Sequence, residues 1–378
     1  MLQLPPLSLY IHIPWCVRKC PYCDFNSHQA GSEIPEQAYV RKLIADLRAD
    51  WHWAQGRKLH SIFFGGGTPS LFSGAAIGEI LNAAEQIIGF EQDIEITLEA
   101  NPGTFEQQKF ADFYGAGVNR LSIGVQSFDN SHLERLGRIH DGDQALKAIA
   151  TARVAGFNNF NIDLMHGLPN QSLDEAVTDI QLAMDNGAQH ISWYQLTIEP
   201  NTEFYSRPPA LPNDDRLADI QQAGMSQLQD KNFDQYEVSA FALNSQTSRH
   251  NINYWQFGDY MGIGAGAHGK VTLPEQGCVI RTNKTRQPDK YLAREGSVIA
   301  QNKVIAADEI ALEFMMNGLR LKQGVLAEYF SPRTGLDVSN MEAQIKDLQR
   351  KGLMAIGTER YVTTKLGYQF LNTVLQGF

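Results

Sequence analysis

The sequence has no run of about 18 apolar residues, the length that a membrane-spanning helix needs. Its first residues, MLQLPPLSLYIHIP, lack the cationic start, apolar core and small-residue cleavage site of a secretory signal. We therefore expect a cytoplasmic protein without a transmembrane segment. Peripheral contact with a membrane stays open, although the sequence contains no anchor.

Positive charge is also scarce. The chain has 32 Lys and Arg against 42 Asp and Glu, which gives a net charge of −10. A nucleic-acid backbone would repel such a protein, and no basic patch with interleaved aromatic residues appears, so we exclude nucleic-acid binding. With 378 residues, 43% of them hydrophobic, the composition is that of a globular chain with one large α/β domain and a smaller one.

Cysteine is rare: the chain has four, and three fall within eight residues. A disulfide framework would spread its cysteines along a short secreted chain. Clustered thiols in a cytosolic chain predict metal ligands instead. Cys278 stands alone, and we expect a free buried or surface thiol there.

Short β-branched or aromatic runs alternate with amphipathic helical patterns through the first two-thirds of the chain. Repeated units of this size predict a parallel sheet covered by helices, here an α/β partial (β/α)6 barrel. The expected strands are Ser8–Ile13, Ser61–Phe64, Ile94–Glu99, Arg120–Val125, Asn159–Leu164 and His190–Leu196. The expected helices are Glu36–Trp53, Ile77–Ile88, Phe105–Tyr114, Asp143–Ala155, Leu173–Asp185 and Asp214–Leu228.

The pattern changes near residue 235. A strand is expected at Tyr236–Phe241, followed by the glycine-rich segment GIGAGAHG at 262–269. Helices at Ala306–Leu321 and Met341–Lys351, a short strand at Glu359–Thr364 and a last helix predict a smaller α+β domain of winged-helix type. Without a basic recognition helix, we interpret it as a docking or lid domain. We predict a barrel over 1–235, a connector over 236–300 and the C-terminal domain over 301–378.

The segment CVRKCPYC places Cys16, Cys20 and Cys23 in C-x3-C-x2-C spacing after the first strand. Thiolates at short spacing suit zinc or an iron–sulfur cluster. Structural zinc usually takes four protein ligands, and His28 would have to supply the fourth. Three thiolates on a [4Fe–4S] cluster would leave one iron open to a chelating molecule.

Polar residues follow the other strands, where barrel chemistry is normally found. They are Gly66, Gly67 and Thr68 in FFGGGTPS, Glu99 in TLEANP, Gln126 and Arg138 after the fourth strand, and Asp163 in NIDLMHGLP. Each also has a structural interpretation, such as a tight turn, a helix cap or a solvent contact. Together they predict a ring of polar groups at one end of the barrel.

These motifs resemble the radical S-adenosylmethionine (SAM) superfamily over nearly the whole chain. Within it the sequence is similar to the branch of the oxygen-independent coproporphyrinogen III dehydrogenases, and most to the HemW subgroup of haem chaperones. The resemblance implies that Cys16, Cys20 and Cys23 hold the cluster and that its open iron chelates SAM. It implies that Tyr10, Gly66 and Glu99 contact the SAM bound at the cluster. The residues that match contacts to a second SAM molecule in the dehydrogenases are Tyr22, Gly67, Thr68, Gln126, Arg138 and Asp163. Thr197 matches such a contact more weakly.

Two departures separate the chain from the dehydrogenases. Phe25 stands where they have a fourth cysteine, and the first strand begins by residue 8, so their N-terminal extension is absent. The segment HNINYW matches the HNxxYW motif of this subgroup, in which the motif is associated with haem. By that resemblance His250 would ligate haem iron, with Asn251 beside it and Tyr254 and Trp255 packed on the macrocycle; His12, His166 and His268 are alternative ligands. A capped turn with core aromatics is the structural alternative.

The resemblance implies a protein that binds haem and delivers it to apo haem proteins of the respiratory chain, with the cluster and SAM in a regulatory role. A radical enzyme that cleaves SAM and acts on a porphyrinogen is the second hypothesis, in which the cofactor supplies the chemistry. A structural protein with a degenerate site is the third. We assign no catalytic residue.

Overall fold

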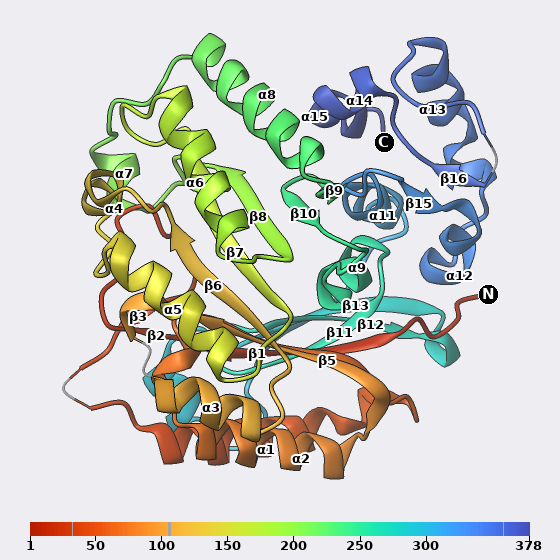
Figure 1. Cartoon of the computed structure of the whole chain (residues 1–378). Helices are drawn as coiled ribbons and strands as arrows, with labels where there is room; N and C mark the ends of the chain where they lie inside the picture. Colours follow the sequence, from red (N-terminus) through yellow and green to blue (C-terminus); the bar gives the residue numbers. More distant parts are fainter. Residues whose placement is uncertain (32, 105–106, 358) are drawn as a thin grey trace.

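The computed structural model describes residues 1–31, 33–104, 107–357 and 359–378. Its centre is a sheet in which six parallel strands lie in the order β1-β4-β5-β6-β7-β8, so the predicted α/β fold is confirmed (Figure 1). All six predicted strands are present. Their bounds are β1 Leu7–Ile13, β4 Leu59–Gly66, β5 Phe90–Ala100, β6 Arg120–Gln126, β7 Phe160–His166 and β8 His190–Gln195.

Amphipathic helices connect these strands and cover the outer face of the sheet (Figure 1). Serine and aspartate caps fix several helix starts; Asp141 and Ser172 each form a capping box. The predicted helix at 105–114 begins at Gln107, and residues 105 and 106 lie outside the described part of the chain. The bounds are α1 Glu36–Asp50, α2 Gly74–Ile87, α3 Gln107–Gly115, α4 Asn130–Arg135, α5 Gly142–Val154, α6 Leu173–Asp185, α7 Glu203–Ser206 and α8 Asp214–Asp230.

Residues after 233 extend this sheet at both edges. β11 (Asp259–Ile263) pairs in parallel with β1, and β12 (His268–Leu273), β13 (Cys278–Lys284) and β14 (Ile299–Val304) follow it antiparallel. At the other edge, β10 (Ala240–Ala242) pairs antiparallel with β8.

The single strand predicted at 236–241 is wrong. The structure has two strands there, β9 (Asp234–Glu237) and β10, paired antiparallel. A turn separates them, and the Ser239 N–H and hydroxyl both donate to Glu237 Oε1, at 3.1 and 3.2 Å. A local hydroxyl–carboxylate bond of this kind favours a turn over a continuous strand.

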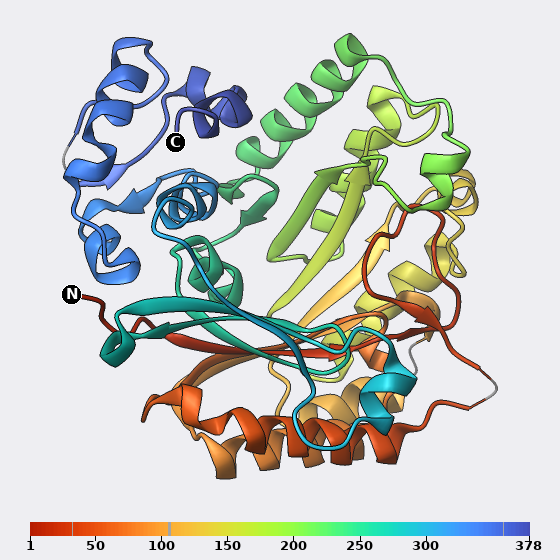
Figure 2. The ribbon, with the colours of Figure 1, turned by 180° about the vertical axis from the view of Figure 1, so that it is seen from behind.

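The last 70 residues form a second core. Phe314, Phe330, Met341 and Leu348 are buried together, and Leu2 from the other end of the chain joins them. The chain start therefore lies against the C-terminal helices (Figure 2). The elements are α11 Ile310–Gly318, α12 Phe330–Thr334, α13 Ser339–Arg350, α14 Lys365–Gln369, α15 Leu371–Leu375 and the two-residue strands β15 Val325–Leu326 and β16 Arg360–Tyr361.

The division of the chain at residues 235 and 300 stays a prediction, although the strands of 236–300 share the sheet of the barrel. Among the described residues, no helix combines the length and apolar character that crossing a membrane requires.

Candidate functional site

The cysteine loop follows the carboxyl end of β1. Its two ends are tied by the short strands β2 (Trp15–Cys16) and β3 (His28–Gln29), which pair in parallel. Within the loop the Cys23 N–H donates to the Cys20 carbonyl at 3.1 Å. The thiols of Cys16, Cys20 and Cys23 are free and half-buried, and all three line one cavity of about 360 Å³. We name it the thiol cavity.

Each thiol has a polar neighbour. Cys20 Sγ lies 3.5 Å from Arg138 Nη1, and Cys23 Sγ lies 3.5 Å from Ser27 Oγ. Burial raises the pKa of the Cys16 thiol, and a hydrogen bond with Thr68 acts in the opposite direction. A half-buried guanidinium and hydroxyl groups are the environment that stabilises thiolate and sulfide charge.

Arg138 is fixed from two sides. Its Nη2 donates to the Gly124 carbonyl at 2.8 Å, and Nη1 also lies 3.4 Å from the Tyr22 hydroxyl. Both Tyr22 and Arg138 line the thiol cavity. The segment after β6 therefore places a half-buried cation beside the cysteine loop.

The strand ends add carboxyl groups to the same cavity. Glu99 Oε2 accepts the Gly66 N–H at 3.3 Å, and burial, with the Asp163 charge second, raises the pKa of Glu99 to about 8. Asp163 accepts from Ser122 and Asn161, at 2.9 and 2.8 Å, and burial raises its pKa. At neutral pH Glu99 is thus largely a neutral hydrogen-bonding group.

Glycine is required at two positions of the GGG run. Gly66 has φ +113°, and a Cβ on it would lie 2.4 Å from the His12 ring. A Cβ on Gly67 would lie 2.5 Å from the Trp15 carbonyl. The run therefore lets β4 approach the cysteine loop, and it places the Gly66, Gly67 and Thr68 backbone on the cavity wall.

The fourth strand end is unusual in its backbone. Gln126 has φ +70°, a conformation that non-glycine residues seldom adopt, and its Oε1 accepts the Tyr194 hydroxyl at 2.8 Å. This conformation turns the amide into the thiol cavity. Thr197 is exposed, donates to Glu199 Oε1 at 2.8 Å, and is not among the residues that line this cavity.

The thiols fit a cluster better than a single metal ion. In residues 1–31, 33–104, 107–357 and 359–378, no three His, Cys, Asp or Glu side chains converge closely enough to hold one ion. His28, the fourth ligand of the zinc alternative, has its Nε2 3.1 Å from Asn26 Oδ1. A cluster takes each thiolate on a different iron, which suits thiols spaced around a cavity wall.

A second cavity of about 750 Å³ adjoins the first and shares Phe25, Gly66 and Glu99 with it. We name it the rim cavity. Aromatic rings and imidazoles form much of its wall, and β12 and β13 contribute to it. Its other lining residues are Tyr10, His12, Asp24, Asn26, Tyr254, Tyr260, Gly266, His268, Asn283, Lys284, Arg286 and Ala300.

The HNINYW segment forms α9 (Arg249–Trp255) and is divided between the cavities. Asn251 and Trp255 line the thiol cavity, and Tyr254 lines the rim cavity. His250 lines neither. It is 3% exposed, its Nδ1 lies 2.9 Å from Ser61 Oγ, and burial lowers its pKa to about 3.

The other candidate histidines differ in exposure. His12 Nε2 lies 2.9 Å from the Asn26 carbonyl, and its Nδ1 lies 3.0 Å from the Tyr10 hydroxyl. His166 is buried against the Trp193 ring, with centroids 4.1 Å apart. His268 is exposed on the wall of the rim cavity.

Sequence reasoning missed Tyr260 and Arg286, because nothing in the chain before β11 signals that β11–β13 fold back beside β1. The available signal was the glycine-rich segment 262–269, which runs from the end of β11 to the start of β12. Gly262 and Gly264 lie where a Cβ would meet the His268 and His12 backbone, at 2.0 and 2.4 Å.

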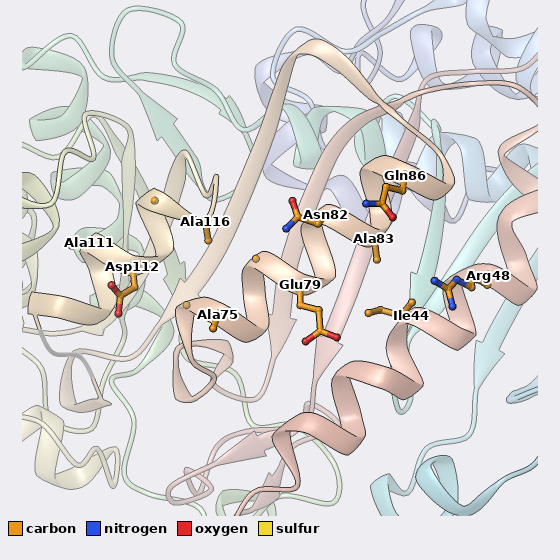
Figure 3. Close-up of a pocket in the computed structure, with 13 residues that line it drawn as sticks. Ile44, Arg48, Ala75, Glu79, Asn82, Ala83, Gln86, Ala111, Asp112 and Ala116 are labelled. Atoms are coloured by element: carbon orange, nitrogen blue, oxygen red, sulfur yellow. The ribbon is translucent and has the colours of Figure 1, made fainter.

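A third cavity, of about 950 Å³, lies among α1, α2 and α3 on the outer face (Figure 3). Small residues such as Ala75, Gly78, Ala83 and Ala116 form much of its wall, with Glu79 at its side. None of the predicted site residues lines it, so it is separate from the site.

Comparisons with known proteins show the family to which the chain is similar. The radical SAM superfamily model matches residues 10–183, and the HemN C-terminal domain model matches residues 305–370. A Haemophilus influenzae protein named heme chaperone HemW is 49% identical over 100% of this chain and 99% of its own length. The Escherichia coli protein of that name is 48% identical over the same shares.

A solved structure has the same fold. It is the Escherichia coli coproporphyrinogen III oxidase HemN, described as a radical SAM enzyme, with a TM-score of 0.82 over 99% of this chain and 90% of that one. The two sequences are 20% identical, so this likeness concerns the fold alone.

Proposed function

The chain belongs to the HemW family of the radical SAM superfamily, and we propose from this premise that it is a haem chaperone. It binds haem, carries a [4Fe–4S] cluster with SAM, and delivers haem to apo haem proteins of the respiratory chain. The observation that carries the proposal is the pair of joined cavities: one lined by three free thiols, the other by aromatic rings and imidazoles.

In this proposal Cys16, Cys20 and Cys23 hold the cluster. Arg138 beside Cys20 and Ser27 beside Cys23 stabilise its negative charge. When bound, such a cluster supplies an electron and one iron position that no protein thiolate occupies.

SAM would be held by the strand ends. Tyr10, Gly66 and Glu99 would contact the molecule at the cluster. Glu99 has a raised pKa, and its neutral form can donate a hydrogen bond to a carboxylate as well as accept one from an amine. A second SAM would be contacted by Tyr22, Gly67, Thr68, Gln126, Arg138 and Asp163.

The HNINYW segment supports haem handling by position. Tyr254 reaches the rim cavity while Trp255 and Asn251 reach the thiol cavity, so α9 forms part of both walls. His250 lies behind them against Ser61 and Phe63. A haem in either cavity would therefore contact a residue of this segment.

One observation favours a radical enzyme as the second candidate: the thiol cavity gathers all the proposed second-SAM contacts except the weaker match, Thr197, in one place. Phe25 in the fourth-cysteine position argues against a coproporphyrinogen dehydrogenase. The two functions predict different products, because a chaperone needs no SAM cleavage.

The test is to reconstitute the protein anaerobically, reduce it, add SAM and haem, and follow 5′-deoxyadenosine and the Soret band in one sample. A stable Soret band with little deoxyadenosine, followed by haem transfer to an apo b-type respiratory protein, is the expected result. Repeated SAM turnover that depends on an added porphyrin would overturn the chaperone in favour of the enzyme.

A further inference from the structure

We propose that haem binds in the rim cavity with the imidazole of His268, and not that of His250, on its iron. This inference rests on the proposed haem-chaperone function and deepens it. It is carried by the contrast between the two histidines and by the chemistry of the wall around His268.

The His250 side chain is buried in the protein interior. Its Nδ1 pairs with Ser61 Oγ, its backbone N–H donates to Glu95 Oε1 at 3.0 Å, and its ring packs on Phe63 with centroids 5.1 Å apart. Its Nε2 is buried without a hydrogen-bond partner among the described residues, but it faces neither cavity. To reach a macrocycle this histidine would have to leave the core.

The His268 side chain is exposed, whereas the His250 side chain is buried and hydrogen-bonded. His268 opens β12, pairs in register with Asn283 of β13, and both residues line the rim cavity. The ring is exposed, and within the described part of the chain no side-chain hydrogen bond to it occurs. A neutral imidazole with an accessible nitrogen is the usual protein ligand of haem iron.

The walls suit a flat apolar macrocycle. The rings of Tyr254 and Tyr260 stack with centroids 4.1 Å apart, and Phe25, 65% exposed, projects at the opening. The volume of about 750 Å³ falls within the roughly 300–1,000 Å³ of small-molecule and cofactor pockets. A porphyrin ring would cover the exposed ring of Phe25 and the half-buried ring of Tyr254, behind which Tyr260 is buried.

A haem also carries two propionates, and the cavity offers an arginine for them. Arg286 uses its Nε to donate to Asn26 Oδ1 at 3.2 Å, which leaves its terminal nitrogens for a carboxylate. Lys284 also lines the cavity, but its Nζ is held by Asp46 and Asp50. Two carboxyl groups also line the cavity and would repel the propionates. Asp24 belongs to the cysteine loop, and Glu99 lies on the wall shared with the thiol cavity. We therefore place the propionates at Arg286.

The experiment compares single variants of the full-length, cluster-loaded protein by haem titration. His268→Ala should shift the Soret maximum and weaken haem binding at least tenfold, and free imidazole should restore the wild-type band to His268→Gly. His52→Ala, an exposed histidine outside the cavity, is the matched control and should bind like wild type. Arg286→Ala should weaken binding about three- to tenfold, and Arg41→Ala should not.

The outcomes separate the two proposals. A wild-type protein that binds no haem would refute the chaperone function itself. Wild-type binding that His268→Ala leaves unchanged would overturn the rim-cavity ligand. His250→Gln keeps a hydrogen-bonding group next to Ser61; if this variant, with unchanged iron content and thermal unfolding, loses the Soret band, His250 is the ligand. If this variant keeps the band while His268→Ala loses it, His268 is the ligand.

Discussion

The two cavities share a wall but are built in opposite ways. The thiol cavity stands on the ends of parallel strands, and its carboxyl groups, Glu99 and Asp163, are half-buried, with pKa values raised by their burial. The rim cavity includes the antiparallel strands β12 and β13 added beside β11, and its residues His268 and Arg286 are exposed. The difference suits the thiol cavity to retaining a cofactor and the exposed side of the rim cavity, around His268 and Arg286, to exchanging a cargo. The proposed SAM contacts Gly66 and Glu99 lie on the wall that the two cavities share.

The largest expected effect concerns the thiol cavity alone. Cys20→Ser should reduce iron and acid-labile sulfide to background after anaerobic reconstitution, because one of the three proposed cluster ligands is lost. Cys278→Ser is the control, since Cys278 is a lone half-buried thiol at the start of β13. If Cys20→Ser abolished haem binding as well, the two cavities would not be separable in function.

The second prediction tests whether the rim cavity depends on buried charge. Lys284 Nζ lies 2.5 Å from Asp46 Oδ1 and 2.5 Å from Asp50 Oδ2, all three buried. Lys284→Met leaves two buried carboxylates unpaired, so the free energy of unfolding in urea should fall by about 3–5 kcal/mol. Lys303→Met breaks an exposed pair with Glu309 and should cost under about 1 kcal/mol. Equal losses would contradict this account of the wall.

The third prediction is a pH effect specific to the thiol cavity. The Glu99 pKa of about 8 in the folded protein exceeds its ordinary value of 4.5, so the folded state holds the proton more tightly than the unfolded state. This stabilisation is complete below about pH 4.5 and is lost as pH rises toward 8.

Unfolding of the cluster-free protein at pH 5.5 and pH 8 measures this effect. Wild type should lose about 2–3 kcal/mol relative to Glu99→Gln over that range. Glu134→Gln removes an exposed carboxylate and should behave like wild type. A parallel pH dependence in wild type and Glu99→Gln would contradict the raised pKa.

The smallest effect is expected at the shared wall. Phe25→Ala removes an exposed ring that lines both cavities, and it should weaken haem binding about two- to fivefold without changing iron content. Ile356→Ala, an exposed apolar residue in the C-terminal region, is the control. Loss of iron in Phe25→Ala would mean that the ring supports the cysteine loop.

The alternating strands and helices of the barrel could be predicted from the sequence, and the strands that follow them could not. The periodicity of β1 and β4–β8 gave their positions, and the rule that parallel strands end at one edge brought Glu99, Gln126 and Asp163 into one cavity. The rim cavity depends on the long-range pairing of β11 with β1, which no local pattern encodes. The burial of His250 could not be predicted for the same reason, because its hydrogen-bond partner Ser61 lies 189 residues away in the sequence.

That pairing also has a consequence for synthesis. β4, the first neighbour of β1, is about 200 residues ahead of β11, the second neighbour. At a translation rate of about 5–20 residues per second, β1 and the cysteine loop behind it have one open edge for roughly 10–40 s. Leu2 finds its core still later, with the last helices. The three thiols are thus synthesised before the strands that form the rim cavity, so the proposed cluster could be assembled on them before the proposed cargo site exists.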